Sequence, residues 1–207
     1  MRKIDVCKPT IHIENMSTIQ EDCKRWAEEI KKSYHPDLII FIAKSGFLFA
    51  KPMAEIFGCN MADIVVERPG NNSKNRLQKI IDVLPMSVIA GVLRSPFMYK
   101  FNAAKKERQI RLTPKYEAEC RKKYEKILIV DDSVDTGWTL LKVLELTKKN
   151  FLDAKIKVAS YSVIEYSKVR VQVDFIRFEN RIVITATSRK SEEYQTFLEM
   201  YGQWKEK

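Results

Sequence analysis

Two adjacent carboxylates, Asp131 and Asp132, follow an apolar, β-branched run at Ile127–Val130. Such a run is typical of a buried parallel strand. A short turn containing Thr136-Gly137 separates the acids from Trp138–Lys149, where apolar residues recur at helical spacing. In an open α/β sheet, ligands bind at the carboxyl ends of the strands. We therefore expect a ligand to bind at the turn between this strand and the helix.

The acids and the turn suit two different parts of a sugar phosphate. Backbone N–H groups at a helix start, helped by the hydroxyls of Thr136 and Thr139, hold a phosphate. The two carboxylates suit ribose hydroxyls, or a hard cation such as magnesium that takes oxygen ligands. Neighbouring side chains on a regular strand point to opposite faces, so only one acid faces the sugar directly unless the strand end bends. Together these residues predict a site for a ribose 5-phosphate group.

The stretch Lys126–Leu140 also resembles the motif with which type I phosphoribosyltransferases bind 5-phosphoribosyl 1-pyrophosphate (PRPP). The family pattern is an apolar strand, two acids, two variable residues and Asp-Thr-Gly-x-Thr, and here the last part reads Asp135-Thr136-Gly137-Trp138-Thr139. The alternative is a receiver-like domain with an acidic strand end, but such a domain does not need Asp-Thr-Gly-x-Thr after the acids.

The resemblance implies a role for each part of this motif. Asp131 and Asp132 would orient the ribose and bind Mg²⁺, which makes them the predicted metal ligands. Asp135 would approach the incoming base as a catalytic residue, and the 135–139 backbone would hold the 5′-phosphate. The predicted substrate-binding residues of the motif are Asp131, Asp132, Ser133, Val134, Asp135, Thr136, Gly137, Trp138 and Thr139.

A second loop, Lys44-Ser45-Gly46, follows the buried strand expected at Leu38–Ala43. Taken alone, it is an ordinary strand-to-helix turn with an exposed lysine. Beside the first motif it resembles the pyrophosphate loop of hypoxanthine-guanine phosphoribosyltransferases, with Ser45 in place of a glycine. The resemblance implies that Ala43, Lys44, Ser45 and Gly46 bind pyrophosphate, with Lys44 as a catalytic point charge. In that family the loop often carries a cis peptide.

Alternating helices and strands predict an α/β fold, a Rossmann-like parallel sheet flanked by helices. Further strands are expected at Met61–Val66 and Lys155–Val163, and helices at Phe47–Phe57 and from a capping box at Ser17 to about residue 34. The resemblance implies the type I phosphoribosyltransferase fold in one domain, 1–207, with a core of about 17–165 and a helical insertion of about 68–100. Residues 166–207 and the N-terminal segment would form a small hood.

The hood is expected to contain a hairpin of Val171–Phe178 and Arg181–Thr187 and a closing helix at Ser191–Tyr201. The Val173–Phe178 segment resembles the nucleobase hood of hypoxanthine-guanine enzymes. Gln172, however, stands where those enzymes place the lysine that reads the purine oxygen.

A later aspartate of the hypoxanthine-guanine hood corresponds here to Ser188 or Arg189. The acceptor therefore stays open. Arg177, Arg181 or Arg189 could suit a more anionic acceptor, or could only decorate the predicted hairpin.

Composition narrows the function classes. The 207 residues carry a formal charge of +10, partly in the basic run Lys105–Lys126, and this suits an anionic substrate or a solvated face. Charge alone suggests nucleic-acid binding, but we see no such motif and rank it last. No apolar run could span a bilayer or serve as a signal peptide, so we expect a cytoplasmic protein without a membrane partner. The four cysteines form no Cys-x-x-Cys pair.

The loop before the motif strand closes over the substrate in the family and adds a cation, for which Lys105, Lys106, Arg108 and Arg111 are candidates. The resemblance implies a Mg²⁺-dependent pentosyltransferase of nucleotide salvage, transferring phosphoribosyl from PRPP to a nucleobase or related nitrogen acceptor. The alternative is a regulator that binds PRPP without turning it over. A homodimer is expected by family analogy alone.

Overall fold

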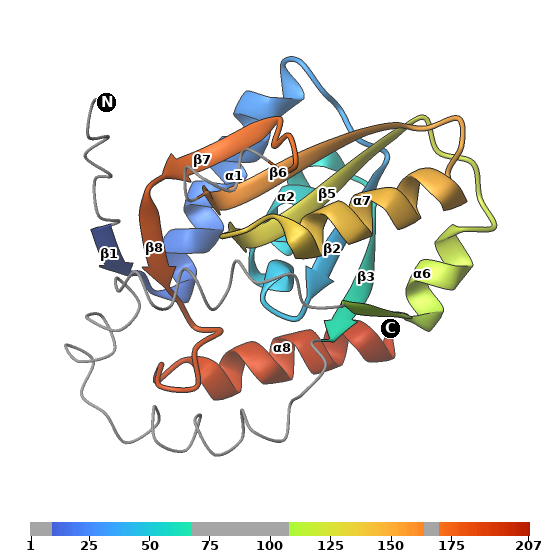
Figure 1. The fold of residues 1–207 in the computed structure, drawn as a ribbon. Coiled ribbons are helices and arrows are strands. Elements are labelled where there is room, and N and C mark those ends of the chain that lie inside the picture. The colour runs from blue at the N-terminus through green and yellow to red at the C-terminus, as the bar shows by residue number, and fades with distance from the viewer. Residues whose placement is uncertain (1–9, 68–107, 164–169) are drawn as a thin grey trace, which may run out of the picture.

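The computed structural model describes residues 10–67, 108–163 and 170–207 (Figure 1). Its elements follow in the order β1 (Thr10–Ile13), α1 (Met16–Lys31), β2 (Leu38–Ala43), α2 (Gly46–Phe57), β3 (Asn60–Glu67), β4 (Gln109–Leu112), α6 (Pro114–Glu119), β5 (Lys126–Val134), α7 (Trp138–Asn150), β6 (Lys155–Val163), β7 (Phe175–Glu179), β8 (Arg181–Ile184) and α8 (Tyr194–Glu206).

Six strands form the main sheet in the order β4-β3-β2-β5-β6-β7, and all neighbouring pairs but β3 and β4 are parallel. The predicted parallel α/β sheet flanked by helices is confirmed. Its central strands are apolar on both faces because helices cover both faces, and the first five residues of β2 are all buried.

The two faces of the sheet bury separate apolar clusters. One cluster joins α1, α2 and α8 to residues such as Phe41 and Val130. The other joins α6 and α7 to their strand neighbours, such as Ile40 and Ile129. Figure 1 shows α7 in front of the sheet and α2 behind it. The carboxyl ends of β2 and β5 therefore lie between two packed layers that hold them in place.

Helix α1 begins earlier than the capping box at Ser17 predicts. Its N-cap is Asn15, whose side chain accepts a hydrogen bond from the Thr18 amide at 2.8 Å. Asn15 Oδ1 also accepts from the Ser17 hydroxyl at 3.0 Å, so Ser17 lies inside the first turn. Asparagine and serine are about equally good N-caps, and capping by Asn15 adds Met16 and Ser17 to the start of the helix.

Strand β5 does not end at Val130, as the two acids suggested, but continues to Val134. Pairing with β6 persists over this extension, with Ser133 opposite Ser162 and Val134 opposite Val163. A strand is extended by the neighbour it bonds to, and the polarity of Asp131 and Asp132 does not interrupt backbone pairing. Both acids are thus held on regular strand backbone.

The predicted hairpin of 171–178 and 181–187 is wrong. Strand β7 pairs in parallel with β6 in the main sheet, whereas β8 pairs in parallel with β1 in a separate two-stranded sheet. A two-residue hairpin of the common type needs positive φ at both turn residues. In Glu179-Asn180 only Asn180 has a positive φ, at 52°. The turn therefore does not bring β7 and β8 together as a hairpin.

Part of the expected basic loop at 99–115 is regular structure. Gln109–Leu112 is β4, which pairs antiparallel with β3 at the edge of the sheet. The Thr113 hydroxyl then caps α6 by accepting from the Tyr116 amide at 3.2 Å. The helical insertion predicted at 68–100 and the candidates Lys105 and Lys106 lie outside the described residues.

The closing helix is confirmed, although α8 starts at Tyr194 and runs past Tyr201 to Glu206. Phe197 and Tyr201 are buried, as their spacing predicted, and Tyr194 and Leu198 pack at the margin of the same cluster. Within the described residues, no helix is both long and apolar enough to cross a membrane.

Candidate active site

A cavity of about 290 Å³ opens where the carboxyl ends of β2, β3 and β5 meet the start of α7. Every residue of the predicted motif, 131–139, lines it, as does Ser45 from the second loop. The cavity is therefore lined by residues of both predicted motifs, the 131–139 stretch and the loop that contains Ser45. It also lies at the sheet edge that open α/β folds use for ligands.

The phosphate part of the motif is the start of α7. Gly137 is the N-cap, with a left-handed φ of 73°, a backbone conformation that glycine adopts without steric cost. Because glycine has no side chain, it cannot cap the first-turn amides of the helix as serine or aspartate would. These amides and the helix dipole therefore favour an anion at this point.

The two acids occupy different environments. Asp131 is 6% exposed, and its Oδ1 accepts a hydrogen bond from the Asp132 amide at 3.1 Å. Part of the Asp132 side chain is exposed, but surrounding protein desolvates the carboxyl and raises its pKa. Hydrogen bonds from Asp131, Ser45 and backbone amides oppose that rise in pKa. Both acids nevertheless line the cavity, although neighbouring side chains on a regular strand point to opposite faces.

The second loop lies against the motif strand. Gly46 begins α2, and a Cβ there would lie 3.3 Å from the Val130 carbonyl oxygen and 3.4 Å from Phe41 Cβ. Glycine thus allows the loop to approach β5 closely. The peptide bond between Ala43 and Lys44 is cis. Ser45 lines the same cavity as Asp132 and acts to lower the pKa of that carboxyl, so residues of the two predicted binding loops meet here.

Lys44 points elsewhere. Its side chain is exposed, and its Nζ lies 5.9 Å from the centre of the Tyr194 ring at the start of α8. Ala43, Lys44 and Gly46 do not line the cavity, whereas Ser45 does. The catalytic role of Lys44 stays a prediction. Asp135 lines the cavity beyond the end of β5 and is partly exposed, so it can meet a second substrate.

The cavity also includes residues that the motifs did not indicate. Ile42 and Val66 come from the ends of β2 and β3, and Leu140 comes from the first turn of α7. The rule that ligands bind at carboxyl ends of strands would have found the first two. Arg108, one of four candidate cations, also lines the cavity and donates from Nε to the Thr139 hydroxyl at 3.3 Å.

Trp138, at the variable position of Asp-Thr-Gly-x-Thr, lines the cavity and contacts the hood side of the molecule. The Arg170 guanidinium lies 5.2 Å from the centre of the Trp138 ring. An arginine stacked on tryptophan is a favourable cation–π pair. The sequence left open whether Trp138 packs on the hood or on the core, and this contact favours the hood.

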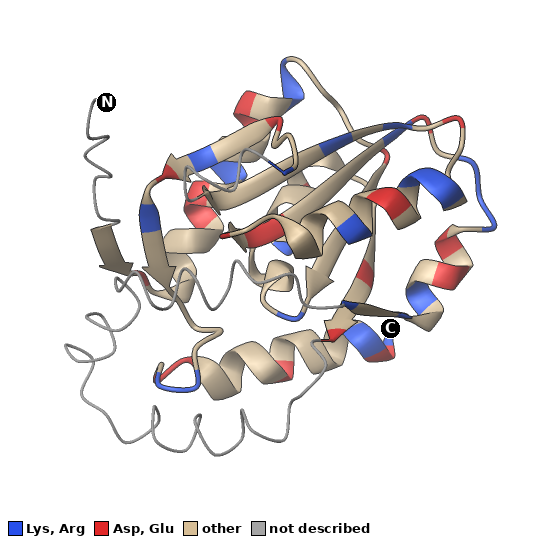
Figure 2. Cartoon of the chain, viewed as in Figure 1, with Lys and Arg blue, Asp and Glu red and all other residues tan. Residues whose placement is uncertain are grey.

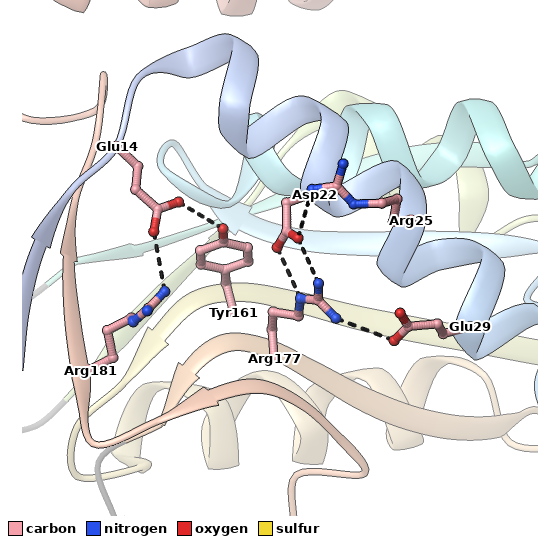
Figure 3. A network of polar contacts seen from close by, with 7 residues as sticks. All are labelled: Glu14, Asp22, Arg25, Glu29, Tyr161, Arg177 and Arg181. Carbon is pink, nitrogen blue, oxygen red and sulfur yellow. Dashed lines mark hydrogen bonds and ion pairs between the residues drawn. The ribbon is translucent and has the colours of Figure 1, made fainter.

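Arg177, considered for an anionic acceptor, is engaged in the protein itself (Figure 3). Its guanidinium donates to both oxygens of Asp22, at 2.9 and 2.6 Å, and to Glu29 at 3.3 Å. The hydrogen bond with Asp22 raises the pKa of Arg177. These contacts tie β7 to α1.

Arg181 is engaged in the same network. It donates to Glu14 at 3.3 Å, and Glu14 also accepts from the Tyr161 hydroxyl at 3.0 Å (Figure 3). Arg177 therefore ties β7 of the main sheet to α1. Arg181 ties β8 to Glu14 and, through Glu14, to Tyr161 of β6. Arg189 is exposed, and its role as a contact for an acceptor stays a prediction.

The donor set at the cavity fits a magnesium ion. In the described part of the chain, no group of three or more His, Cys, Asp or Glu could form a metal site made of protein alone. Magnesium, however, commonly binds through one or two carboxylates and takes its other ligands from water and substrate phosphates. Asp131 and Asp132, both on the cavity wall, provide this kind of partial site.

A family model for the phosphoribosyl transferase domain matches residues 12–175, which span the motif strand, both loops and the main sheet up to the start of β7. The chain belongs to the phosphoribosyl transferase domain family. The family resemblance inferred from the sequence is thus confirmed, and with it a phosphoribosyltransferase, a glycosyltransferase enzyme that works with PRPP. A search of the curated proteins found no match to this sequence.

Solved structures share the family fold. A purine phosphoribosyltransferase from Pyrococcus horikoshii Ot3 is 20% identical with a TM-score of 0.57, over 84% of this chain and 92% of that one. A Neisseria gonorrhoeae hypothetical protein with bound ppGpp is 13% identical with a TM-score of 0.59, over 95% and 98%. The Helicobacter pylori xanthine-guanine-hypoxanthine phosphoribosyltransferase is 12% identical with a TM-score of 0.55, over 94% and 99%. At these identities the likeness is one of fold.

Proposed function

We propose that this family member is a Mg²⁺-dependent phosphoribosyltransferase that moves the phosphoribosyl group of PRPP to a nucleobase or related nitrogen acceptor and releases pyrophosphate. One observation carries the proposal: all of 131–139 lines a single cavity, with two carboxylates on a strand end and an uncapped helix start beside them. Carboxylates for the sugar and metal, and amides for the phosphate, are what PRPP requires.

The proposed reaction displaces pyrophosphate from C1 of the ribose. Breaking that bond develops positive charge on the ribose ring and negative charge on the departing pyrophosphate. Orientation of the substrates and electrostatic stabilisation of the leaving group supply most of the acceleration. Asp131 and Asp132 would hold a magnesium ion at this cavity, and the bound ion would stabilise the negative charge that develops on the leaving group.

The residues of this chain divide that work. Asp131 and Asp132 would hold the ribose hydroxyls and the metal. The first-turn amides of α7, with Thr136 and Thr139, hold the 5′-phosphate. Ser45, which lines the cavity beside Asp132, brings the pyrophosphate loop next to the acids. Asp135 accepts a proton from the acceptor nitrogen or fixes its position.

A purine is the first acceptor to test. Two of the structures with the same fold are purine phosphoribosyltransferases, and a third holds a guanine nucleotide. Gln172 is exposed where the hypoxanthine-guanine enzymes have their base-reading lysine. Because Arg177 and Arg181 are engaged in ion pairs, a neutral base is a better match than a strongly anionic one.

Charge does not favour a nucleic acid partner. In Figure 2, acidic segments stand next to basic ones on α6, α7 and α8. Lys122, just after α6, pairs with Glu119 at the end of that helix, and Lys142 pairs with Glu145 on α7. These are mixed, solvated helix faces. A cytoplasmic location and a homodimer stay predictions.

The test is a screen of nucleobases with PRPP and MgCl₂, following pyrophosphate release, with purines first and pyrimidine bases as the second set. We expect release that depends on both the base and Mg²⁺. PRPP binding by calorimetry without turnover of any base would identify the protein as a PRPP-binding regulator. Absence of both binding and turnover would contradict the proposal.

A further inference from the structure

Arg108 contacts the phosphate end of the motif. Its Nε donates to the Thr139 hydroxyl at 3.3 Å, although the two residues are 31 positions apart in the chain. Both residues line the cavity. Thr139 lies in the first turn of α7, among the amides that favour an anion. Arg108 therefore brings a permanent positive charge to the helix start.

The position of Arg108 follows from the pairing of β4. Strand β4 runs antiparallel to β3, with Gln109 opposite Glu67 and Ile110 opposite Val66. Arg108 comes one residue before Gln109, so it lies at the carboxyl end of β3, where Val66 also lines the cavity. The pairing of β4 with β3 thus places Arg108 at the edge of the cavity. The sequence did not predict strand β4.

Electrostatics indicates which ligand suits the place where Arg108 meets α7. The N-terminus of a helix carries partial positive charge and favours an anion, and Asp131, Asp132 and Asp135 line the rest of the same cavity. The start of α7 and the guanidinium of Arg108 are two positive groups beside one cavity. A phosphate placed between them would accept hydrogen bonds from both, and hydrogen bonds between an arginine and a phosphate are strong because both groups are charged.

Arg111, only three residues further along β4, provides a contrast. Its side chain is 64% exposed and its Nε lies 3.4 Å from Glu67 Oε1. It does not line the cavity. Side chains three positions apart on an extended backbone point to opposite sides. Arg108 therefore lines the cavity while Arg111 faces solvent, and Arg111 is a matched control.

We propose, on the basis of the function proposed above, that Arg108 is a substrate-binding residue for the 5′-phosphate of PRPP, acting with Thr139. This role differs from that of a cation closing over the pyrophosphate, because Arg108 donates to Thr139 in the 135–139 part of the motif.

The experiment measures binding of three probes by calorimetry with Mg²⁺: PRPP, ribose 5-phosphate and pyrophosphate. Wild type, Arg108→Gln, Arg108→Lys and Arg111→Gln are compared. Arg108→Gln is expected to weaken PRPP and ribose 5-phosphate by at least about tenfold, since a hydrogen bond to a charged group contributes roughly 1.5–3 kcal/mol. Pyrophosphate affinity should stay within about twofold of wild type.

The control variants sharpen the result. Arg111→Gln should bind all three probes like wild type, and Arg108→Lys should recover part of the ribose 5-phosphate affinity because it keeps the charge but loses the planar fork. Circular dichroism checks that each variant is folded, and the comparison between probes within one variant does not depend on its stability.

Two outcomes would overturn the assignment. Loss of pyrophosphate affinity alone in Arg108→Gln would make Arg108 a cation for the leaving group, and unchanged affinities would make its contact with Thr139 merely structural. In both cases wild type still binds PRPP, so the proposed function survives. If wild type binds neither PRPP nor ribose 5-phosphate, the proposed function and the role of Arg108 fall together.

Discussion

Asp135 differs from the two acids that precede it in the motif. Asp131 and Asp132 lie on β5, where strand pairing with β6 holds the backbone. Asp135 lies one residue beyond the end of that strand, in the turn before α7, and lines the cavity while remaining partly exposed. A carboxylate in this position can reach a group that enters from solvent. The acids on the strand are therefore suited to the sugar, and Asp135 to the acceptor.

We predict that Asp135→Asn slows phosphoribosyl transfer by about 10²–10⁴-fold, the range for loss of a general acid or base. PRPP affinity should change little, because asparagine preserves the size of the side chain and the phosphate contacts are made by other residues. Steady-state kinetics and calorimetry on the same preparation check this. Equal losses of turnover and of PRPP binding would instead show that Asp135 supports the loop structure.

At the scale of elements, the network in Figure 3 joins β7 and β8 to α1, to β6 and to Glu14 before α1. Arg177 of β7 binds Asp22 and Glu29 of α1, and Arg181 of β8 binds Glu14, which also accepts from Tyr161 of β6. Asp22 is buried, which by itself would raise its pKa, but hydrogen bonds and charge from Arg177, and then Arg25, lower it. The contact between β7 and α1 thus depends on an ionised Asp22.

We predict that Asp22→Asn destabilises the protein by about 1.5–3 kcal/mol near neutral pH, the value of a hydrogen bond to a charged group. The pKa of Asp22 is lower in the folded than in the unfolded state. The ionised carboxylate therefore stabilises the fold above the unfolded value, roughly pH 4, and this contribution is lost as the pH falls through the folded value. Urea unfolding from pH 7 down to pH 3 measures the difference.

The gap between wild type and Asp22→Asn should narrow as the pH drops below about 4. Arg25→Gln is the control: Arg25 also contacts Asp22 at 3.3 Å, but its side chain is 64% exposed, so its loss should cost less than about 1 kcal/mol. A gap that stays constant down to pH 3 would mean that Asp22 acts through packing and not through its charge.

At the scale of the whole molecule, the cavity joins parts of the chain that are far apart in sequence. Its wall is made by β2, β3, β5, the start of α7 and Arg108 before β4. The hood is joined across even longer distances, since β1 near the N-terminus pairs with β8 near the C-terminus. A ligand that bridges these elements binds the folded chain only, and its binding energy is added to the stability of the fold.

We predict that PRPP with Mg²⁺ raises the unfolding temperature. At a concentration of about 100 times its Kd, a ligand stabilises the fold by about 2.7 kcal/mol. For a chain of this size each kcal/mol corresponds to about 2–4 °C, so a shift of roughly 5–10 °C is expected. Thermal scans with ribose, which has no phosphate, provide the control. An equal shift with ribose, or none with PRPP, would contradict a phosphate-anchored site.

The sequence by itself determined the parts of this protein that are local. An apolar strand, two acids, a glycine turn and a helix lie within the fifteen positions of Lys126–Leu140, so their order along the chain already sets their order in space. Gly137 and the amides after it form an anion site through backbone geometry alone. The same holds for the turn at Lys44-Ser45-Gly46 after its buried strand.

Only the tertiary structure decided which distant segments meet. Arg108 hydrogen-bonds Thr139. Strand β7 joins the main sheet, whereas β8 pairs with β1. Arg177 hydrogen-bonds Asp22, which lies 155 positions away in the chain. The periodicity of a sequence does not show which remote segments pair with each other, because a given strand or charged side chain could pair with several others. The packing of the whole chain selects among them, and that selection settled which arginine faces the cavity.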